Sequence, residues 1–222
     1  RAVGAMTREN AWWRVLGLAV AASYVYMLGP ITVVVIESFS AADTMRFPPE
    51  RLSLRWFWAL AENADFLGSF RVSLVLAMVT ALISTVAGSL AAYSLVRHRG
   101  RGQAGIETLL LAPLYVPRVL LGMALLLTLS KLSLAGSFLG MAVGHILITL
   151  PFVVRTATAS LAGIDPALEE AARSLGATWR QSFLRVTVPL MRSGVVSGAV
   201  FAFIISFSDV YLALFIAGPA TI

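Results

Sequence analysis

The sequence predicts an all-α, polytopic membrane protein, and three observations support that prediction. Hydrophobic residues make up 59% of the 222 positions and charged residues only 13%, with a mean hydropathy of +0.86. Soluble chains are about 25% charged, so too few charged residues remain here to cover an aqueous surface. The apolar residues also gather in runs of about 20, the length of a helix that crosses a bilayer.

Five such runs are expected to span the membrane. They cover approximately residues 15–36, 72–96, 108–129, 134–154 and 195–217. The first run contains Ala19-Val20-Ala21, which resembles a signal-peptide cleavage site, but the apolar run continues well beyond it and favours a membrane anchor. We therefore expect residues 1–222 to form one transmembrane domain, with a cytoplasmic loop at 155–192.

Two runs carry residues that predict how their helices bend or pack. The third contains Pro113 and Pro117, which free backbone carbonyls that protein or water must satisfy. The fifth opens on Gly194-Val195-Val196-Ser197-Gly198, a small-xxx-small pattern that permits close contact between membrane helices.

The arginines predict the orientation, because short cytoplasmic loops retain an excess of Lys and Arg. Eleven basic and five acidic residues fall in the N-terminal segment, around 97–107 and in the loop 155–192, whereas the opposite side has five of each. The net charge of +6 is therefore expected on the cytoplasmic side, together with the N-terminus. This charge needs no nucleic acid to explain it.

Composition also argues against an enzyme. The chain has no cysteine, which removes disulfides and thiol catalysis, and only His98 and His145 could offer imidazole ligands, so no metal site is expected. His145 is expected to be a helix-contact residue. We find neither a phosphate-cradling glycine–lysine loop nor a nucleophile–base pair, so no catalytic residue is assigned. An intramembrane enzyme and a free-standing channel remain distant alternatives.

The loop at 155–192 is patterned as two short helices. Asp165-Pro166 supplies an N-cap and a proline at the first helical position, and Gly176 stands where a left-handed residue would end the helix Ala167–Leu175. Thr178-Trp179-Arg180-Gln181 forms a capping box for a second helix, which Pro189 is expected to end.

The first of these helices carries an apolar edge at helical spacing. It consists of Leu168, Ala171, Ala172 and Leu175. A solvated hairpin without a partner is the simpler interpretation, but an apolar edge on a water-exposed loop suggests that another protein covers it.

At these residues the chain resembles the EAA motif of inner-membrane permease subunits of ABC importers. The matching residues are Glu170-Ala171-Ala172, then Gly176, then Val186-Thr187-Val188-Pro189, with valines where the motif usually has Ile and Leu. The resemblance extends over nearly the whole chain and is greatest to the second permease subunit of spermidine/putrescine-type importers. It continues through 29–30, 38–39, 113–122, 145–151 and 206–219.

The resemblance implies a type I ABC importer fold and a set of partners. The expected partners are a second permease subunit that is a different chain, two cytoplasmic ATPase subunits that bind ATP and Mg²⁺, and an extracytoplasmic substrate-binding protein. No cofactor is expected in this chain itself, which would be a multi-pass protein of the bacterial inner membrane. Relatives have a sixth span after the match to Gly218-Pro219, so the sequence is interpreted as lacking its last helix. The residues expected to couple to the ATPase are Leu168, Glu170, Ala171, Ala172, Leu175 and Gly176.

Two charges, Arg118 and Asp209, fall inside expected spans. A charge at mid-bilayer is disfavoured by about 2.5–3.5 kcal/mol, so such residues normally face a partner, a cavity or water. Their positions place them roughly 6 Å apart in depth, at about 1.5 Å per helical residue, a gap that long side chains can close. They are interpreted either as a structural ion pair or as residues of the substrate pathway, and the two roles are compatible.

The substrate is expected to be a polyamine or another small organic solute. Polyamine permeases tend to have an acid after the proline that matches Pro117, and two adjacent acids where this chain has Ser208-Asp209. Here the first position is Arg118, and Ser208 replaces one acid. An anionic or zwitterionic solute, such as an amino-acid derivative or a phosphonate, is therefore the alternative. Pro117, Arg118, Ser208 and Asp209 are the candidate pathway residues.

Overall fold

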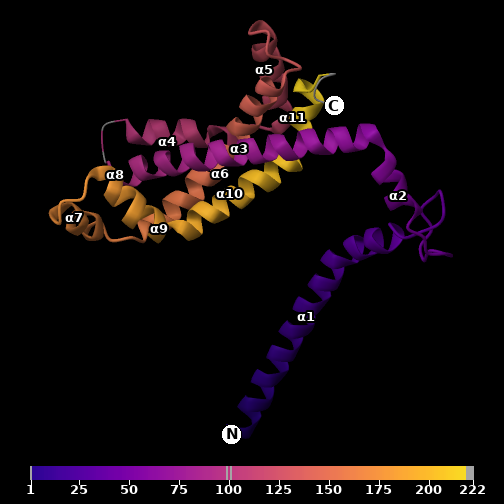
Figure 1. The fold of residues 1–222 in the computed structure, drawn as a ribbon. Coiled ribbons are helices and arrows are strands. Elements are labelled where there is room, and N and C mark those ends of the chain that lie inside the picture. Colours follow the sequence, from indigo (N-terminus) through magenta and orange to yellow (C-terminus); the bar gives the residue numbers. More distant parts are fainter. Residues whose placement is uncertain (1, 99, 101, 219–222) are drawn as a thin grey trace. The chain divides into compact units, whose positions relative to one another are not determined.

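The computed structural model describes residues 2–98, 100 and 102–218. These residues form helices joined by loops, and the loop 38–54 contains an isolated antiparallel bridge between Ser40 and Leu52. The elements, drawn in Figure 1, are α1 (Ala2–Glu37), α2 (Arg55–Glu62), α3 (Ala64–Arg97), α4 (Gln103–Leu111), the 3₁₀ turn η1 (Ala112–Leu114), α5 (Arg118–Lys131), α6 (Phe138–Ala162), α7 (Ala167–Ser174), α8 (Trp179–Ser182), the π-helical η2 (Phe183–Thr187), α9 (Val188–Leu190), α10 (Arg192–Phe207) and α11 (Tyr211–Ile216).

The helices support the predicted all-α membrane class. Three are long and apolar enough to cross a bilayer, namely Trp12–Glu37, Ala64–Arg97 and Phe138–Ala162. Two bent pairs raise the number of candidate spans in the described residues to as many as five: Gln103–Leu114 with Arg118–Lys131, bent by 103°, and Trp179–Leu190 with Arg192–Phe207, bent by 76°.

The chain divides into two compact units, Arg1–Leu67 and Gly68–Ile222. In the first unit, α1 is followed by a loop that folds against α2. The Phe39 and Phe57 rings lie 5.3 Å apart, and Arg55 pairs with Asp43 while its guanidinium lies 4.5 Å from the centroid of the Trp56 ring. These contacts tie the loop to α2.

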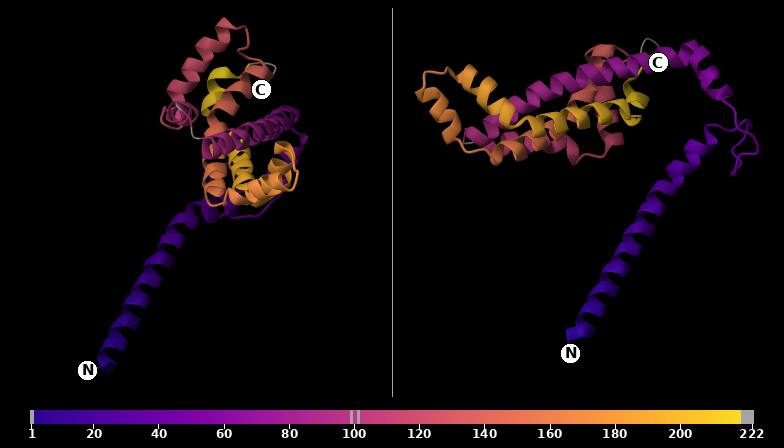
Figure 2. Two further views of the ribbon diagram at one scale, coloured as in Figure 1. Left: turned by 90° about the vertical axis from the view of Figure 1, so that its left-hand side faces the viewer. Right: turned by 60° about the horizontal axis from the view of Figure 1, so that its bottom comes forward.

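In the second unit, α6 is the central helix. The window of α6 that could cross a membrane is 56% buried, against 39% for α3. Figures 1 and 2 show α3, α6 and α10 running side by side, with α7 and α8 at one end of this bundle and α5 and α11 at the other. Helix α6 is therefore the more enclosed of the two long helices of this unit.

Close packing of α10 against α6 confirms the prediction from the small-xxx-small pattern. A Cβ atom on Gly194 would lie 2.5 Å from the backbone oxygen of Thr156, and one on Gly198 would lie 3.0 Å from the Cα of Val153. Real Cβ atoms do not approach other atoms as closely as the first of these distances. Glycine at both positions therefore lets the two backbones meet.

Several helix boundaries differ from those expected. Helix α6 begins at Phe138, where Ser137 caps it, and continues beyond Val154 to Ala162, because Ala157 and Leu161 remain on its buried face. The expected loop at 155–192 therefore begins inside a helix.

The run 195–217 is also not one continuous helix, since α10 ends at Phe207 and α11 begins at Tyr211. Pro189 was wrongly expected to end the second loop helix. Proline lacks an N–H and its ring crowds the carbonyl four residues earlier, and here the chain widens into the π-helical η2 before it and turns only at Met191.

Substituting Gly194→Ala is expected to destabilise the protein, because the new methyl group would overlap the Thr156 carbonyl and Ser160. Overpacking of this kind costs about 1–3 kcal/mol. Thermal unfolding of purified protein in detergent should show a lower apparent Tm. Gly105→Ala, where a Cβ meets no atom within 4 Å, serves as the matched control and should not lower Tm. Equal Tm values for the two variants would contradict the close-packing account.

Candidate coupling surface and membrane ion pair

Helix α7 covers Ala167–Ser174, one residue short of the predicted end at Leu175, and the signals predicted for its two ends are present. The Asp165 carboxylate accepts a hydrogen bond from the Ala167 N–H at 2.9 Å. At the other end Gly176 has φ of +91°, its N–H donates to the Arg173 carbonyl at 2.9 Å, and the Ala177 N–H donates to the Ala172 carbonyl at 3.1 Å. This pair of bonds is a Schellman motif, which needs a left-handed residue at the position of Gly176.

The capping box predicted for the second loop helix is also present. Thr178 accepts a hydrogen bond from the Gln181 N–H at 3.3 Å, and the Gln181 side chain accepts one from the Thr178 N–H at 2.8 Å. The two short helices α7 and α8 are therefore separated by a turn whose geometry is fixed by local hydrogen bonds.

One face of α7 packs against the bundle through Glu169, which is only 4% exposed. Its carboxylate accepts a hydrogen bond from the Tyr93 hydroxyl at 2.8 Å and one from Arg97 Nε at 2.9 Å. Arg97 also donates to the Ile164 carbonyl at 3.1 Å, just before α7. We call Tyr93, Arg97 and Glu169 the α3–α7 clamp.

The clamp was not predicted from the sequence, because the EAA motif contains Glu170 and not Glu169. A signal for it exists in the sequence: Tyr93 and Arg97 are four residues apart, so they share one face of a helix at its predicted cytoplasmic end. In a largely apolar run, a polar face of this kind predicts a buried polar partner.

Aromatic rings reinforce the clamp. The Tyr93 ring meets Phe183 edge-on at 5.0 Å between centroids and Trp179 at 5.9 Å, while Trp179 stacks on Phe183 at 5.6 Å. These rings belong to α3, α8 and η2, so α8 is attached to the same end of α3 as α7.

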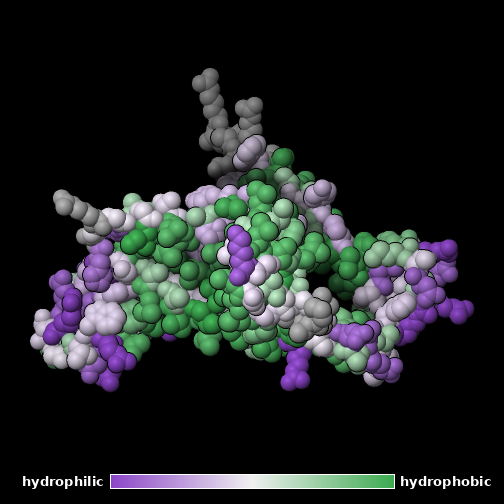
Figure 3. Space-filling model, turned by 90° about the horizontal axis from the view of Figure 1, so that it is seen from above, coloured by the Kyte–Doolittle hydropathy of each residue, from purple (hydrophilic) through white to green (hydrophobic). Residues whose placement is uncertain are grey.

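The opposite face of α7 is exposed. Leu175 is 90% exposed and Leu168 48%, and Glu170 and Ala171 are exposed as well. Ala172 is partly buried. The space-filling view shows hydrophobic surface along the bundle helices and hydrophilic residues gathered at the end that carries α7 and α8 (Figure 3). Exposed leucines therefore stand on a surface that is otherwise largely hydrophilic.

At the other end of the second unit, Arg118 and Asp209 form an ion pair. The expectation that both residues lie inside continuous spans was wrong. Arg118 is the first residue of α5, and Asp209 lies in the break between α10 and α11. The second Asp209 oxygen accepts a hydrogen bond from the Leu212 N–H at 2.7 Å, so the carboxylate also caps α11. The Asp209 side chain is fully buried, whereas the Arg118 side chain is 41% exposed.

The other candidate pathway residues are not part of this pair. Pro117 directly precedes Arg118 and stands at the bend before α5. Ser208 is exposed, and its hydroxyl donates to the Ile204 carbonyl of its own helix at 2.7 Å. His145 is buried on α6 and its Nδ1 shares a 2.8 Å hydrogen bond with the Ser206 hydroxyl of α10, consistent with the expected helix-contact role.

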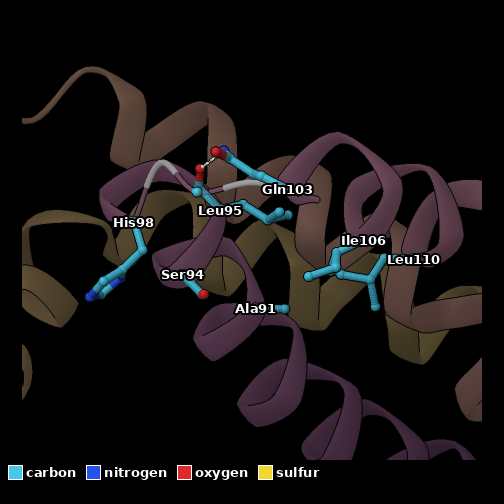
Figure 4. Close-up of a pocket in the computed structure, with 8 residues that line it drawn as sticks. Ala91, Ser94, Leu95, His98, Gln103, Ile106 and Leu110 are labelled. Carbon is cyan, nitrogen blue, oxygen red and sulfur yellow. Dashed lines mark hydrogen bonds between the residues drawn. The ribbon is translucent and has the colours of Figure 1, made fainter.

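A hollow also lies at the turn between α3 and α4 (Figure 4). Gln103 donates a hydrogen bond to the Leu95 carbonyl across it, and the remaining lining includes Ala91, Ile106 and Leu110. None of the described residues that line this hollow carries a carboxylate.

In the described part of the chain, no three His, Asp or Glu residues are grouped so that they could hold a metal ion.

The comparisons with known proteins identify the family. Residues 84–221 match the model of the binding-protein-dependent transport system inner membrane component. This match covers more than half of the chain, so the protein belongs to that family. It is a multi-pass transport permease, and as a member of such a family it is not itself an enzyme.

Two relatives of known function are similar over most of the chain. The spermidine/putrescine transport system permease protein PotC of Escherichia coli K12 is 31% identical over 201 residues, which are 90% of this chain and 75% of the relative. The putrescine transport system permease protein PotI of the same strain is 30% identical over 214 residues, 93% of this chain and 75% of the relative.

A solved structure supports the fold. The crystal structure of a bacterial ABC transporter involved in the import of the acidic polysaccharide alginate contains a chain that matches with a TM-score of 0.74 at 18% identity, over 96% of this chain and 76% of that one. At this identity the match supports the ABC-importer permease fold and carries no information on substrate.

Glu169→Ala is expected to release α7 from α3. The loss of one partner leaves Arg97, whose side chain is 11% exposed, without its carboxylate, and breaking a buried pair costs about 3–5 kcal/mol. Hydrogen exchange of the amides in α7 should accelerate at least about tenfold, since 1.4 kcal/mol corresponds to a factor of ten. Glu170→Ala, the same substitution one residue later on the exposed face, should leave exchange unchanged. Similar acceleration in both variants would contradict the clamp.

Arg118 and Asp209 are expected to respond unequally to neutralisation. Arg118→Leu leaves a fully buried carboxylate unpaired, whereas Asp209→Asn retains an acceptor for the Leu212 N–H and leaves an arginine that is partly exposed. Membrane abundance and Tm should therefore fall further for Arg118→Leu than for Asp209→Asn. The double variant should recover part of the loss seen in Arg118→Leu. Strictly additive losses would show that the two residues do not act as a pair.

Proposed function

We propose that this chain is one of two permease subunits that form the substrate pathway of an ATP-driven importer. Its partners are a second, different permease subunit, two cytoplasmic ATPase subunits that bind ATP and Mg²⁺, and an extracytoplasmic binding protein. Family membership and the importer-like fold support this proposal. The distribution of arginines supports an N-terminus in the cytoplasm.

The main support for the proposed coupling role is that one face of α7 is buried against the bundle and another face is exposed. Its inner face is attached to α3 through buried Glu169, and its outer face offers Leu168 and Leu175 to a partner. A groove on an ATPase subunit that covers these leucines would remove apolar surface from water. Glu170, on another exposed side of α7, is available to pair with a cation of the partner.

This arrangement suggests how ATPase movement reaches the membrane. A force applied to α7 passes through the clamp to α3, and through α8, η2 and α9 to α10. Because α10 and α6 are in close backbone contact, the helices of the second unit would move together as one body. Alternating access then follows from rotation of this body against the second permease subunit.

We propose a polyamine as the substrate. The named functions of the two relatives support this class. The alternative, an anionic or zwitterionic solute, depended on Arg118 as an extra positive charge in the pathway. In the structure that charge is balanced by Asp209, which weakens the electrostatic argument for an anion.

The coupling role is tested at Gly176, where the backbone conformation rather than space limits the side chain. No atom lies within 4 Å of a Cβ built there, but φ is +91°. Valine is strained in this conformation by about 1–2 kcal/mol, whereas asparagine tolerates it. With the complete importer in proteoliposomes, Gly176→Val should lose putrescine uptake and stimulated ATPase activity while still reaching the membrane, and Gly176→Asn should retain most of both.

Wild-type uptake in both Gly176 variants would overturn the coupling role. The substrate class is tested separately, by offering the wild-type importer putrescine, spermidine, an amino acid and a phosphonate. Uptake of the phosphonate but not of the amines would overturn the polyamine proposal and leave the coupling role standing.

A further inference from the structure

A pocket with one uncompensated acid lies in the first unit, where α1 ends. It has a volume of about 270 Å³, and its lining includes Val34, Glu37, Asp43, Thr44 and Trp56. This volume is near the lower end of the range of about 300–1,000 Å³ for small-molecule pockets, so its ligand must be small. By the predicted orientation, the pocket faces the outside of the membrane.

Glu37 is the distinctive residue of this pocket. It is 8% exposed, and its Oε1 atom is buried without a hydrogen-bond partner among the described residues. A buried carboxylate oxygen without a donor is costly, and such atoms are rare in native proteins. A ligand that supplies an N–H donor and a positive charge would remove that cost.

The neighbouring charges do not neutralise Glu37. Asp43 also lines the pocket, but it is already paired with Arg55, whose guanidinium lies against the Trp56 ring. Arg46 is 3.8 Å from Glu50 and so has its own acid. Among the described residues that line the pocket, none is Lys or Arg. The unbalanced charge in the lining is therefore that of Glu37.

The lining also distinguishes between kinds of cation. Ca²⁺ takes six to eight oxygen ligands and Mg²⁺ demands near-octahedral oxygen coordination. The described lining offers the carboxylates of Glu37 and Asp43 and the hydroxyls of Ser38, Ser40 and Thr44, but Asp43 is paired with Arg55. One free carboxylate thus stands beside the apolar side chains of Val34, Met45 and Trp56. An alkylammonium ion suits such a lining better, because its N–H groups can donate to the carboxylate while its methylene groups lie against apolar side chains.

We propose that this pocket binds the terminal ammonium group of a small alkylamine through Glu37. Resting on the proposed function, the pocket would hold one end of a polyamine on the outer side of the permease, before the substrate enters the membrane.

The proposal is tested by titrating putrescine into the importer complex in lipid nanodiscs, without the binding protein, and measuring affinity by calorimetry. Glu37→Gln, which removes the charge at nearly constant size, should weaken binding about tenfold or more, the loss expected for one charge-assisted hydrogen bond. Glu50→Gln neutralises an exposed acid of the same loop and should change affinity less than about twofold. Thr44→Lys adds an ammonium group to the pocket lining and should also block putrescine.

Wild-type affinity in Glu37→Gln would overturn the proposal. If Glu37→Gln does not accumulate in the membrane, unchanged binding by Thr44→Lys would overturn it instead. Displacement of putrescine by equimolar Mg²⁺ would also contradict an alkylamine site. Putrescine uptake by the wild-type importer is measured in parallel. If binding depends on Glu37 but no uptake occurs, the pocket is supported and the polyamine importer is rejected. If uptake occurs but Glu37→Gln binds putrescine as the wild type does, the pocket is rejected and the polyamine importer stands.

Discussion

Glu169 lies almost fully buried between α7 and the end of α3, where it accepts hydrogen bonds from both Tyr93 and Arg97. A carboxylate removed from water in this way must keep its partners, because separating them would leave a charge buried and unpaired. The position of α7 is therefore restricted even though the helix is short and its outer face is exposed. Eight-residue helices are marginal on their own, so α7 depends on this attachment and on its caps.

The attachment of α7 to α3 can transmit movement only if the rest of the second unit is closely packed. Helix α10 meets α6 at glycine positions, which brings the two backbones together, and α6 runs from the clamp end to the end that carries the Arg118–Asp209 pair. That pair joins the start of α5 to the break before α11. The ion pair therefore holds two helix ends together, and each residue compensates the charge of the other, which would be unfavourable alone in a bilayer. The second unit thus connects the exposed surface of α7 to the Arg118–Asp209 pair at its other end through continuous packing.

The sequence predicted those features that depend on local chemistry. Gly176 was identified from its position after a helical pattern and adopts the expected left-handed conformation, and the Thr178–Gln181 capping box was found from its residue types. Features that depend on tertiary contacts were missed or misplaced. Nothing local distinguishes Glu169 from Glu170, since only the direction of α3 decides which carboxylate is buried. The break at Ser208-Asp209 was read as continuous helix, because an apolar run does not reveal where a carboxylate will cap a new helix. The pairing of Arg118 with Asp209 was one of two interpretations, and the structure supports it.

The central claim is that α7 moves with α3 as one body. The chain contains no cysteine, so two spin labels can be attached at introduced cysteines without removing native ones. Labels at Ser174 of α7 and Ser94 of α3, both exposed, report the separation of the two helices by electron–electron double resonance. Measured in the complete importer with and without ATP, the distance distribution is expected to be narrow and unchanged. A distribution that shifts or broadens when ATP binds would show that α7 moves independently of α3 and would contradict the account.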